Sequence, residues 1–589
     1  MSDKMVTIFV DGAATLVDPS RNLLEACAEA GANIPTLCYL KDVSANASCG
    51  VCVVEVEGAK SLVRSCVGRV GEGMKIRTSS PRVMRARKNA VELLLANHPA
   101  DCLVCARNGS CELQAMAETL GIRRVRFPRT RKAPEIDSST DGIMRDNDKC
   151  ILCGRCVAVC SEVQSVSAIQ LAGRGIRTHV ATFMDRGLGK SPCVQCGQCS
   201  VVCPTGAITE RDETDDVWKA LAQSGSTTVV QTAPAIRASL GEALGMPPGS
   251  LVTGKMVAAL RRLGFGRVFD TQFTADLTIM EEGSELIRRL TQGGTLPMIT
   301  SCSPGWINFI ETFYPTLLGH LSTCKSPQQM FGAVAKSFYA EKAGIAPETM
   351  RVASIMPCTA KKHEARRPEM RGAYEYWKAK GNAVPGQSYY DVDWALTTRE
   401  LARMIKRAGI DIATLPEEDF DDPLGRSTGA ATIFGTTGGV MEAALRTVYE
   451  IVTGKTLPSL DFEAIRGLDG IKHAEVDLAG TKVRVAVAHT LRNARILLDE
   501  IAAGKSPYHF IEVMTCPGGC IGGGGQPVHI DMEKRIARNK AMYAEDLRLE
   551  LRKSHDNPSV KALYAEFLGE PLGHLSHELL HTEYTRREV

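Results

Sequence analysis

The chain has 589 residues, more than one hydrophobic core supports, so we expect three to five domains. Its 70 lysines and arginines balance 67 aspartates and glutamates, and this excludes bulk charge as a reason to bind nucleic acid or a membrane surface. No run of 18 apolar residues occurs, and Met1–Lys4 lead directly into a strand-like segment at 5–10 without a signal-peptide core. We therefore predict a cytoplasmic protein with no membrane span and no nucleic-acid partner.

Cysteine is the most informative residue type, with 21 copies. In a reducing cytosol, cysteines in Cys-x2-Cys spacings are usually metal ligands, whereas a secreted protein with an odd count leaves one thiol unpaired. Fifteen of the cysteines stand in ligand-like motifs within the first 203 residues. The sequence therefore predicts a chain that carries several iron-sulfur clusters.

Residues 1–80 begin with the pattern of a hairpin, with a turn at Asp11 and a second strand at 14–17. A helix follows, for which Ser20 is the expected N-cap and Cys27 a packed apolar residue. Four cysteines then stand at intervals that resemble a plant-type ferredoxin loop: Cys38, Cys49, Cys52 and Cys66. We expect a β-grasp domain with one [2Fe-2S] cluster, and a four-cysteine zinc site is the alternative.

Residues 81–126 begin as a basic helix and continue with the predicted ligands His98, Cys102, Cys105 and Cys111. The spacing resembles the [4Fe-4S] module with one histidine and three cysteine ligands that occurs in hydrogenases and in respiratory complex I. An imidazole ligand leaves a cluster with one negative charge less and shifts its potential. Zinc bound by the same four side chains is the alternative.

Residues 127–211 open with a connector at 127–145 and continue with a duplicated motif, the strongest single pattern in the chain. It is typical of two-cluster bacterial ferredoxins, in which the fourth cysteine of each run binds the other [4Fe-4S] cluster. The first predicted ligand set is Cys150, Cys153, Cys156 and Cys203. The second set is Cys193, Cys196, Cys199 and Cys160. With the two preceding domains, these clusters make a plausible wire for single electrons.

Residues 212–530 have the composition of an α/β domain, and residues 531–589 that of a helical, basic tail. Short apolar strands at 226–234, 267–270, 296–300, 352–356 and 483–488 alternate with helical stretches, a rhythm that predicts parallel sheets covered by helices. Ligands in such folds gather at the carboxyl ends of strands, and Cys302 and Cys358 both follow predicted strands. For the histidines of the tail we expect a docking surface rather than metal ligation.

Cys516 and Cys520 have three residues between them and stand beside glycines, which allow backbone to approach a bulky inorganic group. A disulfide between them is the alternative. Together with the segments 300–306 and 356–362, this segment resembles the active-site signature of the [FeFe]-hydrogenases, and 273–285 and 434–442 match that family too. The resemblance implies an H-cluster, a [4Fe-4S] cubane bridged to a diiron site with CO, cyanide and azadithiolate. By position Cys520 is the bridging ligand, and Cys358 and Cys516 hold the cubane.

The resemblance also implies residues around the diiron site. A proton path would run through Cys302, Glu282, Ser322, Glu285 and Arg289. Lys361, Ala233, Pro234 and Ala235 would surround the diatomic ligands, and Met356 and Met514 would pack against the site. For Glu282 and Glu285 the alternative is two solvated helix carboxylates, and Glu285 and Arg289 would then form a simple i,i+4 surface ion pair. The two methionines could serve only to fill a core, and Lys362 could be a solvated surface lysine.

One departure from the family pattern stands at Ser303. The usual motif has two adjacent cysteines, of which the first relays protons and the second holds the cubane; alignment on the flanking residues puts Cys302 at the relay and Ser303 at the ligand. Three explanations compete: a serine alkoxide ligand, a Cys302 that swings round to bind, or water or an unstable cubane at the fourth iron.

The resemblance implies an enzyme that oxidises H2 and reduces protons, most similar to the large subunits of NADP-reducing and electron-bifurcating hydrogenases. Expected partners are ferredoxin and subunits that bind flavin, NAD(P) and a [2Fe-2S] cluster, in a hetero-oligomer. The sequence has no Gly-x-Gly-x-x-Gly motif in a βαβ setting, so nicotinamide chemistry would belong to a partner. A sensor with a modified H-cluster and a complex-I-like electron-transfer subunit are the alternatives.

Overall fold

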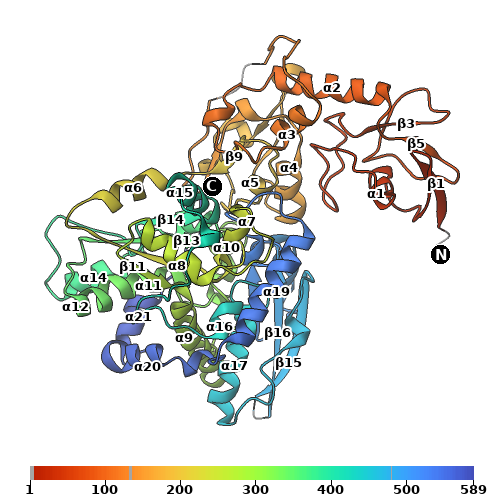
Figure 1. Ribbon diagram of the computed structural model, residues 1–589. Coiled ribbons are helices and arrows are strands. Elements are labelled where there is room, and N and C mark those ends of the chain that lie inside the picture. The colour runs from red at the N-terminus through yellow and green to blue at the C-terminus, as the bar shows by residue number, and fades with distance from the viewer. Residues whose placement is uncertain (1–4, 132–134, 479, 589) are drawn as a thin grey trace.

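We describe the protein from a computed structural model that covers residues 5–131, 135–478 and 480–588. Met1–Lys4 and the middle of the 127–145 connector therefore lie outside the described residues. Figure 1 shows a narrower N-terminal part that projects from a larger rounded body formed by the rest of the chain.

The N-terminal sheet has five strands in the order β2-β1-β5-β3-β4, with β1 parallel to β5, and helix α1 (Leu23–Glu29) packs on it. Its strands are β1 Val6–Val10, β2 Ala13–Val17, β3 Val53–Val56, β4 Val63–Arg64 and β5 Lys75–Arg77. The helix is capped by Asn22, whose side chain accepts the Glu25 N–H at 3.0 Å, so the prediction of Ser20 was wrong. Cys27 is buried in the core, as predicted.

The next two parts form the link between this sheet and the body. Helix α2 (Pro81–Ala96) starts at a Ser80 N-cap and is followed by α3 (Glu112–Thr119). The ferredoxin-like part pairs β6 with β9 and β7 with β8, both antiparallel, around two short helices. Its elements are β6 Ile143–Arg145, α4 Arg155–Ala158, β7 Gln170–Ala172, β8 His179–Ala181, α5 Gln198–Val202 and β9 Ile208–Glu210.

The body contains two four-stranded sheets. In the first, ordered β11-β10-β13-β14, every pair is parallel as predicted. The second sheet has the order β12-β17-β16-β15, and its strands β15 and β16 are antiparallel. Only parallel sheets were predicted from the sequence. These two strands follow each other too closely in sequence for a helix between them, so they can pair only as an antiparallel hairpin. The strands are β10 Thr227–Thr232, β11 Arg267–Asp270, β12 Met298–Ile299, β13 Met350–Met356, β14 Trp394–Thr397, β15 Ile471–Leu478, β16 Thr481–His489 and β17 Phe510–Met514.

Helices cover both sheets, and the C-terminal tail wraps the body rather than projecting from it (Figure 1). The longest helix, α9, runs over Thr271–Gln292 and buries most of its side chains. Other helices of the body include α8 Thr253–Arg262, α10 Pro304–Phe313, α13 Ala360–Glu364, α17 Gly439–Thr453, α18 Leu491–Ala502, α19 Met532–Arg548, α20 Pro558–Leu563 and α21 His574–Leu580. Within the described ranges, no helix has the length and apolar character needed to cross a membrane.

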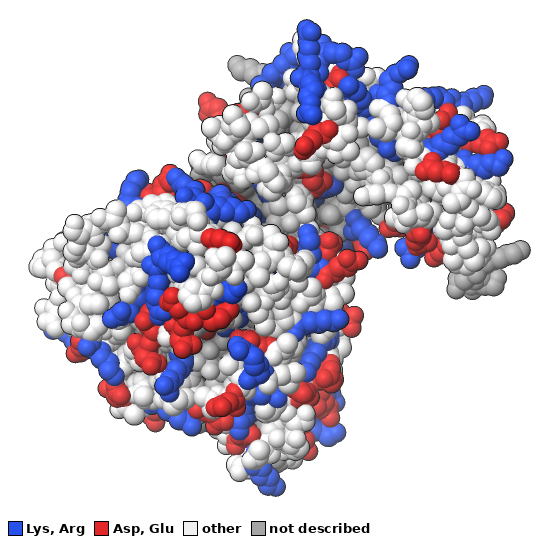
Figure 2. All heavy atoms as spheres, viewed as in Figure 1, with Lys and Arg blue, Asp and Glu red and all other residues white. Residues whose placement is uncertain are grey.

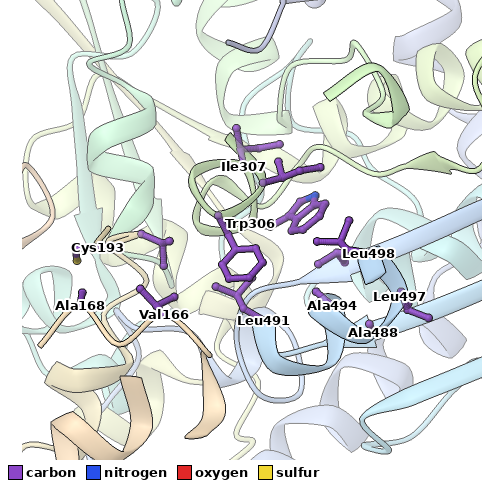
Figure 3. Close-up of a cluster of buried hydrophobic side chains, with 14 of the residues drawn as sticks. Val166, Ala168, Cys193, Trp306, Ile307, Ala488, Leu491, Ala494, Leu497 and Leu498 are labelled. Carbon is purple, nitrogen blue, oxygen red and sulfur yellow. The ribbon is translucent and has the colours of Figure 1, made fainter. Parts of the chain in front are cut away.

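One hydrophobic core joins the ferredoxin-like part to the body. Figure 3 shows Val166 and Cys193 of the former beside Trp306 of α10 and Leu491 of α18. Trp306 is fully buried and its indole N–H donates to the Thr300 carbonyl at 3.0 Å. Because these side chains belong to a single packed cluster, the two parts are expected to keep a fixed relation to each other.

Candidate active site

The accessory cysteines lie together in the predicted groups. Cys52 and Cys66 bring their sulfur atoms within 3.4 Å of each other, and the pKa of Cys38 is lowered to about 5 chiefly by its contact with Cys49. In the ferredoxin-like part, one cavity is lined by Cys150, Cys153, Cys156 and Cys203. A second is lined by Cys160, Cys193, Cys196 and Cys199. Each group of four thus contains the fourth cysteine of the other run, the arrangement that the crossed motif predicts.

The histidine-containing module is nearer the surface. Burial raises the pKa of Cys111 most, and the thiols of Cys102 and Cys105 lie close enough to raise it further. His98 is half-buried, and its Nδ1 atom has no hydrogen-bond partner in the part of the chain that the structure describes. An imidazole with an unpaired buried nitrogen is compatible with the predicted role of His98 as a ligand.

A cavity lies where the body meets the ferredoxin-like part. β12 and β13 end at Ile299 and Met356, so the segments that follow them carry Cys302 and Cys358 into its wall. β17 ends at Met514 and leads Cys516 and Cys520 to the same place. The predicted residues that line it are Ala233, Pro234, Cys302, Ser303, Met356, Cys358, Lys361, Met514, Cys516 and Cys520. Ala235 does not line it and packs against Gly435 instead.

The glycine-rich loop after Cys520 brings the cavity against the accessory domain. A β-carbon on Gly523 would meet the Pro357 carbonyl oxygen at 2.0 Å, and one on Gly524 would meet the Cys196 carbonyl oxygen at 2.0 Å. Only glycine therefore allows the loop to approach both segments, at Pro357 and at Cys196, this closely. Cys196 also lines the active-site cavity, so a ligand position of the second ferredoxin-like group borders the site directly.

Three thiols face one another in the cavity. Burial and the neighbouring sulfurs of Cys358 and Cys520 raise the pKa of Cys516, and burial raises that of Cys520 to about 12. No disulfide joins cysteines among the described residues. Three convergent thiols with an apolar wall, a lysine and a close-packed glycine loop fit a large iron-sulfur group and exclude the alternative of a Cys516–Cys520 disulfide in this structure.

Cys302 and Ser303 face different neighbours. Burial and then the Glu282 carboxylate raise the pKa of Cys302, whose other charged neighbours include Lys361 and Cys520. Ser303 Oγ instead shares a 2.8 Å hydrogen bond with Thr515 Oγ1 and accepts the Thr515 N–H at 3.3 Å. Cys302 thus lies near Glu282, whereas Ser303 lies near Thr515, the residue that precedes Cys516.

The predicted proton-path residues form a buried line along α9. Glu282 and Glu285 are each 1% exposed, which rules out the alternative of solvated helix carboxylates. Burial raises the pKa of Glu282 to about 8, and none of the described side chains donates a hydrogen bond to either of its oxygens. Ser322 Oγ donates to Glu285 Oε2 at 3.1 Å, and Arg289 to Glu285 Oε1 at 2.6 Å. Hydrogen bonds therefore join Ser322, Glu285 and Arg289, whereas Glu282 lies beside Cys302 without a hydrogen bond to the other three.

Two lysines after Cys358 have different surroundings. Lys361 lines the cavity and donates to Glu364 at 2.9 Å and to the Cys302 carbonyl at 3.2 Å. Lys362 is 1% exposed and lies between Glu213 and Glu400 at 3.0 and 2.9 Å, so the interpretation of a solvated surface lysine was wrong. Two carboxylates from distant segments stabilise the buried ammonium, a pairing that local sequence does not reveal.

Several polar residues at the outer end of α9 were missed from sequence. Glu281, Thr323, Cys324 and His581 are packed around Glu285, and His581 comes from the tail. His581 is buried, so the expectation of a docking surface for the tail histidines was wrong for this residue. No short motif joins positions 281 and 581, and only the position of Glu281 next to Glu282 hinted at a role.

The fold and the site define an iron-sulfur oxidoreductase whose buried centre lies between a series of cluster sites and a line of acids. Residues 226–524 match the family "Iron only hydrogenase large subunit, C-terminal domain" and 532–587 "Iron hydrogenase small subunit". Three N-terminal matches are a 2Fe-2S binding domain (3–81), the NADH-ubiquinone oxidoreductase-G iron-sulfur region (87–126) and a 4Fe-4S dicluster domain (149–207).

The chain is similar to several characterised hydrogenases. It is 51% identical to the NADP-reducing hydrogenase subunit HndD of Solidesulfovibrio fructosivorans over 99% of each chain, and 37% identical to iron hydrogenase 1 of Clostridium pasteurianum over 99% of this chain and all of the other. A glutamate-to-alanine variant of the [FeFe]-hydrogenase HydA1 from Chlamydomonas reinhardtii superposes with a TM-score of 0.56 at 43% identity, over 64% of this chain and 99% of that one. The chain belongs to the [FeFe]-hydrogenase family.

Membership settles the class, the fold and the cofactors. The protein is an iron hydrogenase with a β-grasp [2Fe-2S] domain, [4Fe-4S] domains and an α/β catalytic domain, as predicted. It carries one [2Fe-2S] cluster, three accessory [4Fe-4S] clusters and an H-cluster. The sensor and complex-I-like alternatives are not favoured, since the full-length match is to a hydrogenase subunit.

Proposed function

We propose that this chain is the H2-activating subunit of a larger assembly that passes electrons to flavin-, NAD(P)- and [2Fe-2S]-binding subunits or to ferredoxin. The similarity to HndD, a subunit of an NADP-reducing hydrogenase, supports such an assembly. Figure 2 shows Lys and Arg gathered at the outer end of the N-terminal part, near α2, whereas both signs mix over the body. A basic outer end beside the first clusters suits an acidic electron-transfer partner.

The ligands of the catalytic cluster are assigned from the cavity. Cys358, Cys516 and Cys520 would hold the H-cluster, with Cys520 as the bridging thiolate, and Cys196 would hold the accessory cluster on the other side of the loop. When bound, the H-cluster supplies the site at which H2 is split and the electrons are stored. The chain itself excludes water with an apolar wall and places the Lys361 ammonium where it can donate to an anionic ligand.

Ser303 is assigned to the fourth ligand position of the cubane. Its hydroxyl is bonded to Thr515, next to Cys516, whereas Cys302 has Glu282 as its strongest charged neighbour. This geometry favours a Cys302 that remains at the relay. A hydrogen bond from Thr515 Oγ1 would stabilise Ser303 Oγ as an alkoxide if it binds a metal.

Protons would move through groups of this chain in a fixed order. The Cys302 thiol exchanges a proton with Glu282, and Ser322 passes it between Glu282 and Glu285. The raised pKa of Glu282, about 8, suits a group that both gains and loses a proton near neutral pH. Burial sets this value, because the charged carboxylate is disfavoured away from water.

The observation that carries the proposal is the convergence of Cys358, Cys516, Cys520 and Cys302 on one cavity that Cys196 also borders. The test is to mature the full chain with the diiron assembly proteins and to record infrared spectra with H2 evolution. We expect bands of CO and cyanide together with turnover. An iron-replete, matured sample without these bands would overturn the assignment of the site.

A cytoplasmic location is part of the same proposal. Every cysteine among the described residues is free of disulfide bonds, and thiol ligand motifs persist in a reducing compartment. Fractionation of the native host, with the activity in the cytoplasmic fraction, would test it.

A further inference from the structure

Glu285 lies at the end of the proposed relay but not at the surface, because its side chain is 1% exposed. Its Oε2 atom accepts from Ser322 Oγ, from Thr323 N and from Thr323 Oγ1 at 3.0–3.1 Å. Its Oε1 atom accepts from Arg289 at 2.6 Å. A proton that reaches Glu285 therefore needs one further group to exchange with solvent.

Arg289 is poorly suited to that task. A guanidinium does not give up its proton at ordinary pH, so it orients and stabilises an acid but does not relay protons. Its other N–H groups are used on backbone, donating to the carbonyls of Thr295 and Leu321 at 3.1 and 2.7 Å. Arg289 thus anchors Glu285 to the loop around Leu321.

A titratable group lies on the opposite side of Glu285. Thr323 Oγ1, which donates to Glu285, is 2.8 Å from Nδ1 of His581, and Nε2 of His581 is 3.1 Å from Glu281 Oε2. Glu281 also accepts from Tyr564 at 2.5 Å and from the Leu572 N–H. Because the Thr323 hydroxyl donates to Glu285 and Glu281 offers only acceptors, the arrangement is satisfied when both ring nitrogens of His581 donate.

An exposed imidazole lies against the buried His581 ring. The ring of His577, one turn earlier on α21 and exposed, stacks on it with centroids 4.8 Å apart and planes 3° apart. Burial and then the positive His581 and Arg288 lower the pKa of His577, as expected of two imidazoles that share one charge. The charged and titratable groups around His581 are Glu281, Glu285 and Arg288 of α9, Cys324, Tyr564 and His577.

We propose that the proton path leaves Glu285 through Thr323 and His581 to His577, so that the segment matching the iron hydrogenase small subunit supplies the exit. During proton reduction, the Nδ1 proton of His581 passes to the Thr323 oxygen while the Thr323 hydroxyl proton passes to Glu285. Nδ1 of His581 is then reprotonated from solvent, through water at the exposed His577 edge of the stack, because stacked rings share no hydrogen bond of their own. H2 oxidation runs the same transfers in reverse, so protons balance at every group.

A metal site is the competing use of these residues. Glu285, Cys324 and His581 bring ligand atoms within 4.8 Å of one another. Both ring nitrogens of His581 and both oxygens of Glu285 already have hydrogen-bond partners. Binding a cation would break these bonds, so the geometry favours the proton route.

The backbone around His581 is held independently of its side chain, which makes the residue testable. Lys325 N donates to the Leu580 carbonyl at 2.7 Å and Thr582 N to the Thr323 carbonyl at 2.8 Å, a strand-like pairing across Cys324 and His581. Substitution of the ring is therefore expected to leave the tail in place.

The experiment compares His581→Gln, His577→Gln and the control His574→Gln in full-length matured protein. His574 is on the same helix with 89% of its side chain exposed. We expect His581→Gln to lower turnover in both directions on the order of 10²-fold, the usual contribution of a positioned proton carrier, with unchanged CO and cyanide bands. His577→Gln should slow turnover severalfold at low buffer concentration and recover with added imidazole, as removal of a surface carrier does. His574→Gln should remain at the wild-type rate.

Thr323 gives a second, independent test. Thr323→Val removes the hydroxyl at nearly constant volume and should reproduce the loss, whereas Thr323→Ser should restore the rate and the wild-type solvent isotope effect. In protein that lacks the diiron unit, the histidine NMR signal missing from His581→Gln should report a doubly protonated ring at neutral pH. A neutral ring, or a loaded His581→Gln protein within twofold of the wild-type rate, would overturn the exit.

The inference rests on the proposed relay, and the two can fail separately. If Cys302→Ala and Glu282→Gln keep full turnover, the relay itself is wrong. If those two lose turnover while His581→Gln and Thr323→Val keep it, the relay stands and only the exit is wrong.

Discussion

The two sides of the active-site cavity are built by different rules. On the electron side, the ligands come from short motifs such as that of Cys193 to Cys203, and the loop at Gly524 touches the backbone of Cys196. On the proton side, the groups come from α9, from the loop at Ser322 and from the tail at His581. Electrons cross gaps between clusters, whereas a proton is handed between groups that lie close together, so the proton side must bring side chains from distant segments next to one another.

This comparison predicts that single-atom changes on the proton side have the largest effect. Cys302→Ala should lower turnover by about 10³-fold, within the range for loss of a general acid or base, because the thiol next to Glu282 is removed. The cubane EPR signal should be unchanged. Loss of that signal in Cys302→Ala, with its retention in Ser303→Ala, would show that Cys302 is a ligand.

Glu282→Gln should come next, with a loss on the order of 10²-fold. It also has a readout in protein without clusters. The pKa of Glu282 in the fold, about 8, is above its ordinary value, so the folded state binds more protons. The contribution of Glu282 to stability is present at low pH and is lost as pH rises toward 8. The free energy of unfolding of Glu282→Gln, measured with denaturant, should therefore decrease less steeply with rising pH than that of the wild type. Equal slopes would contradict the burial argument.

Ser303 tests the electron side, where we expect a smaller effect. Ser303→Cys should change turnover by less than about tenfold, the lower range for altered surroundings of a metal site, while shifting the cubane potential and its EPR signal. Thr515→Val is the matched variant for Ser303, because it removes the hydroxyl that is hydrogen-bonded to Ser303 and leaves Ser303 itself unchanged. A wild-type EPR signal in Ser303→Cys would mean that this side chain does not bind the cubane.

The smallest effect on turnover is expected from the shared core. Leu491→Ala removes a fully buried side chain between the two parts and should cost roughly 2–5 kcal/mol of unfolding free energy. The rate per loaded molecule should stay close to wild type. Leu547→Ala, at a position 61% exposed, is the control and should change stability little.

The same contrast explains which features could be predicted from sequence. Short cysteine motifs fix how their thiols are arranged, so the two ferredoxin-like ligand groups could be predicted from spacing. The convergence of Cys358, Cys516 and Cys520 could be predicted only with the help of a family resemblance. Burial against distant segments was not. Lys362 looks solvated until Glu213 and Glu400 are brought to it by folding.

The helix start at Asn22 shows the same limit on a small scale. Serine and asparagine are nearly equal N-caps, and the choice depends on which side chain reaches the free N–H of Glu25. His581 was beyond reach for a stronger reason: 258 residues separate it from Thr323, and its significance appears only when the tail closes over α9.

The packing of Val166 and Cys193 against Trp306 and Leu491 has a consequence for engineering. The catalytic half cannot be grafted onto a foreign ferredoxin by cutting at the sequence boundary near residue 212, because the cut would strip apolar surface from both pieces and leave it open to water. A working chimera would have to transplant the interface of the donor as well as its cysteines.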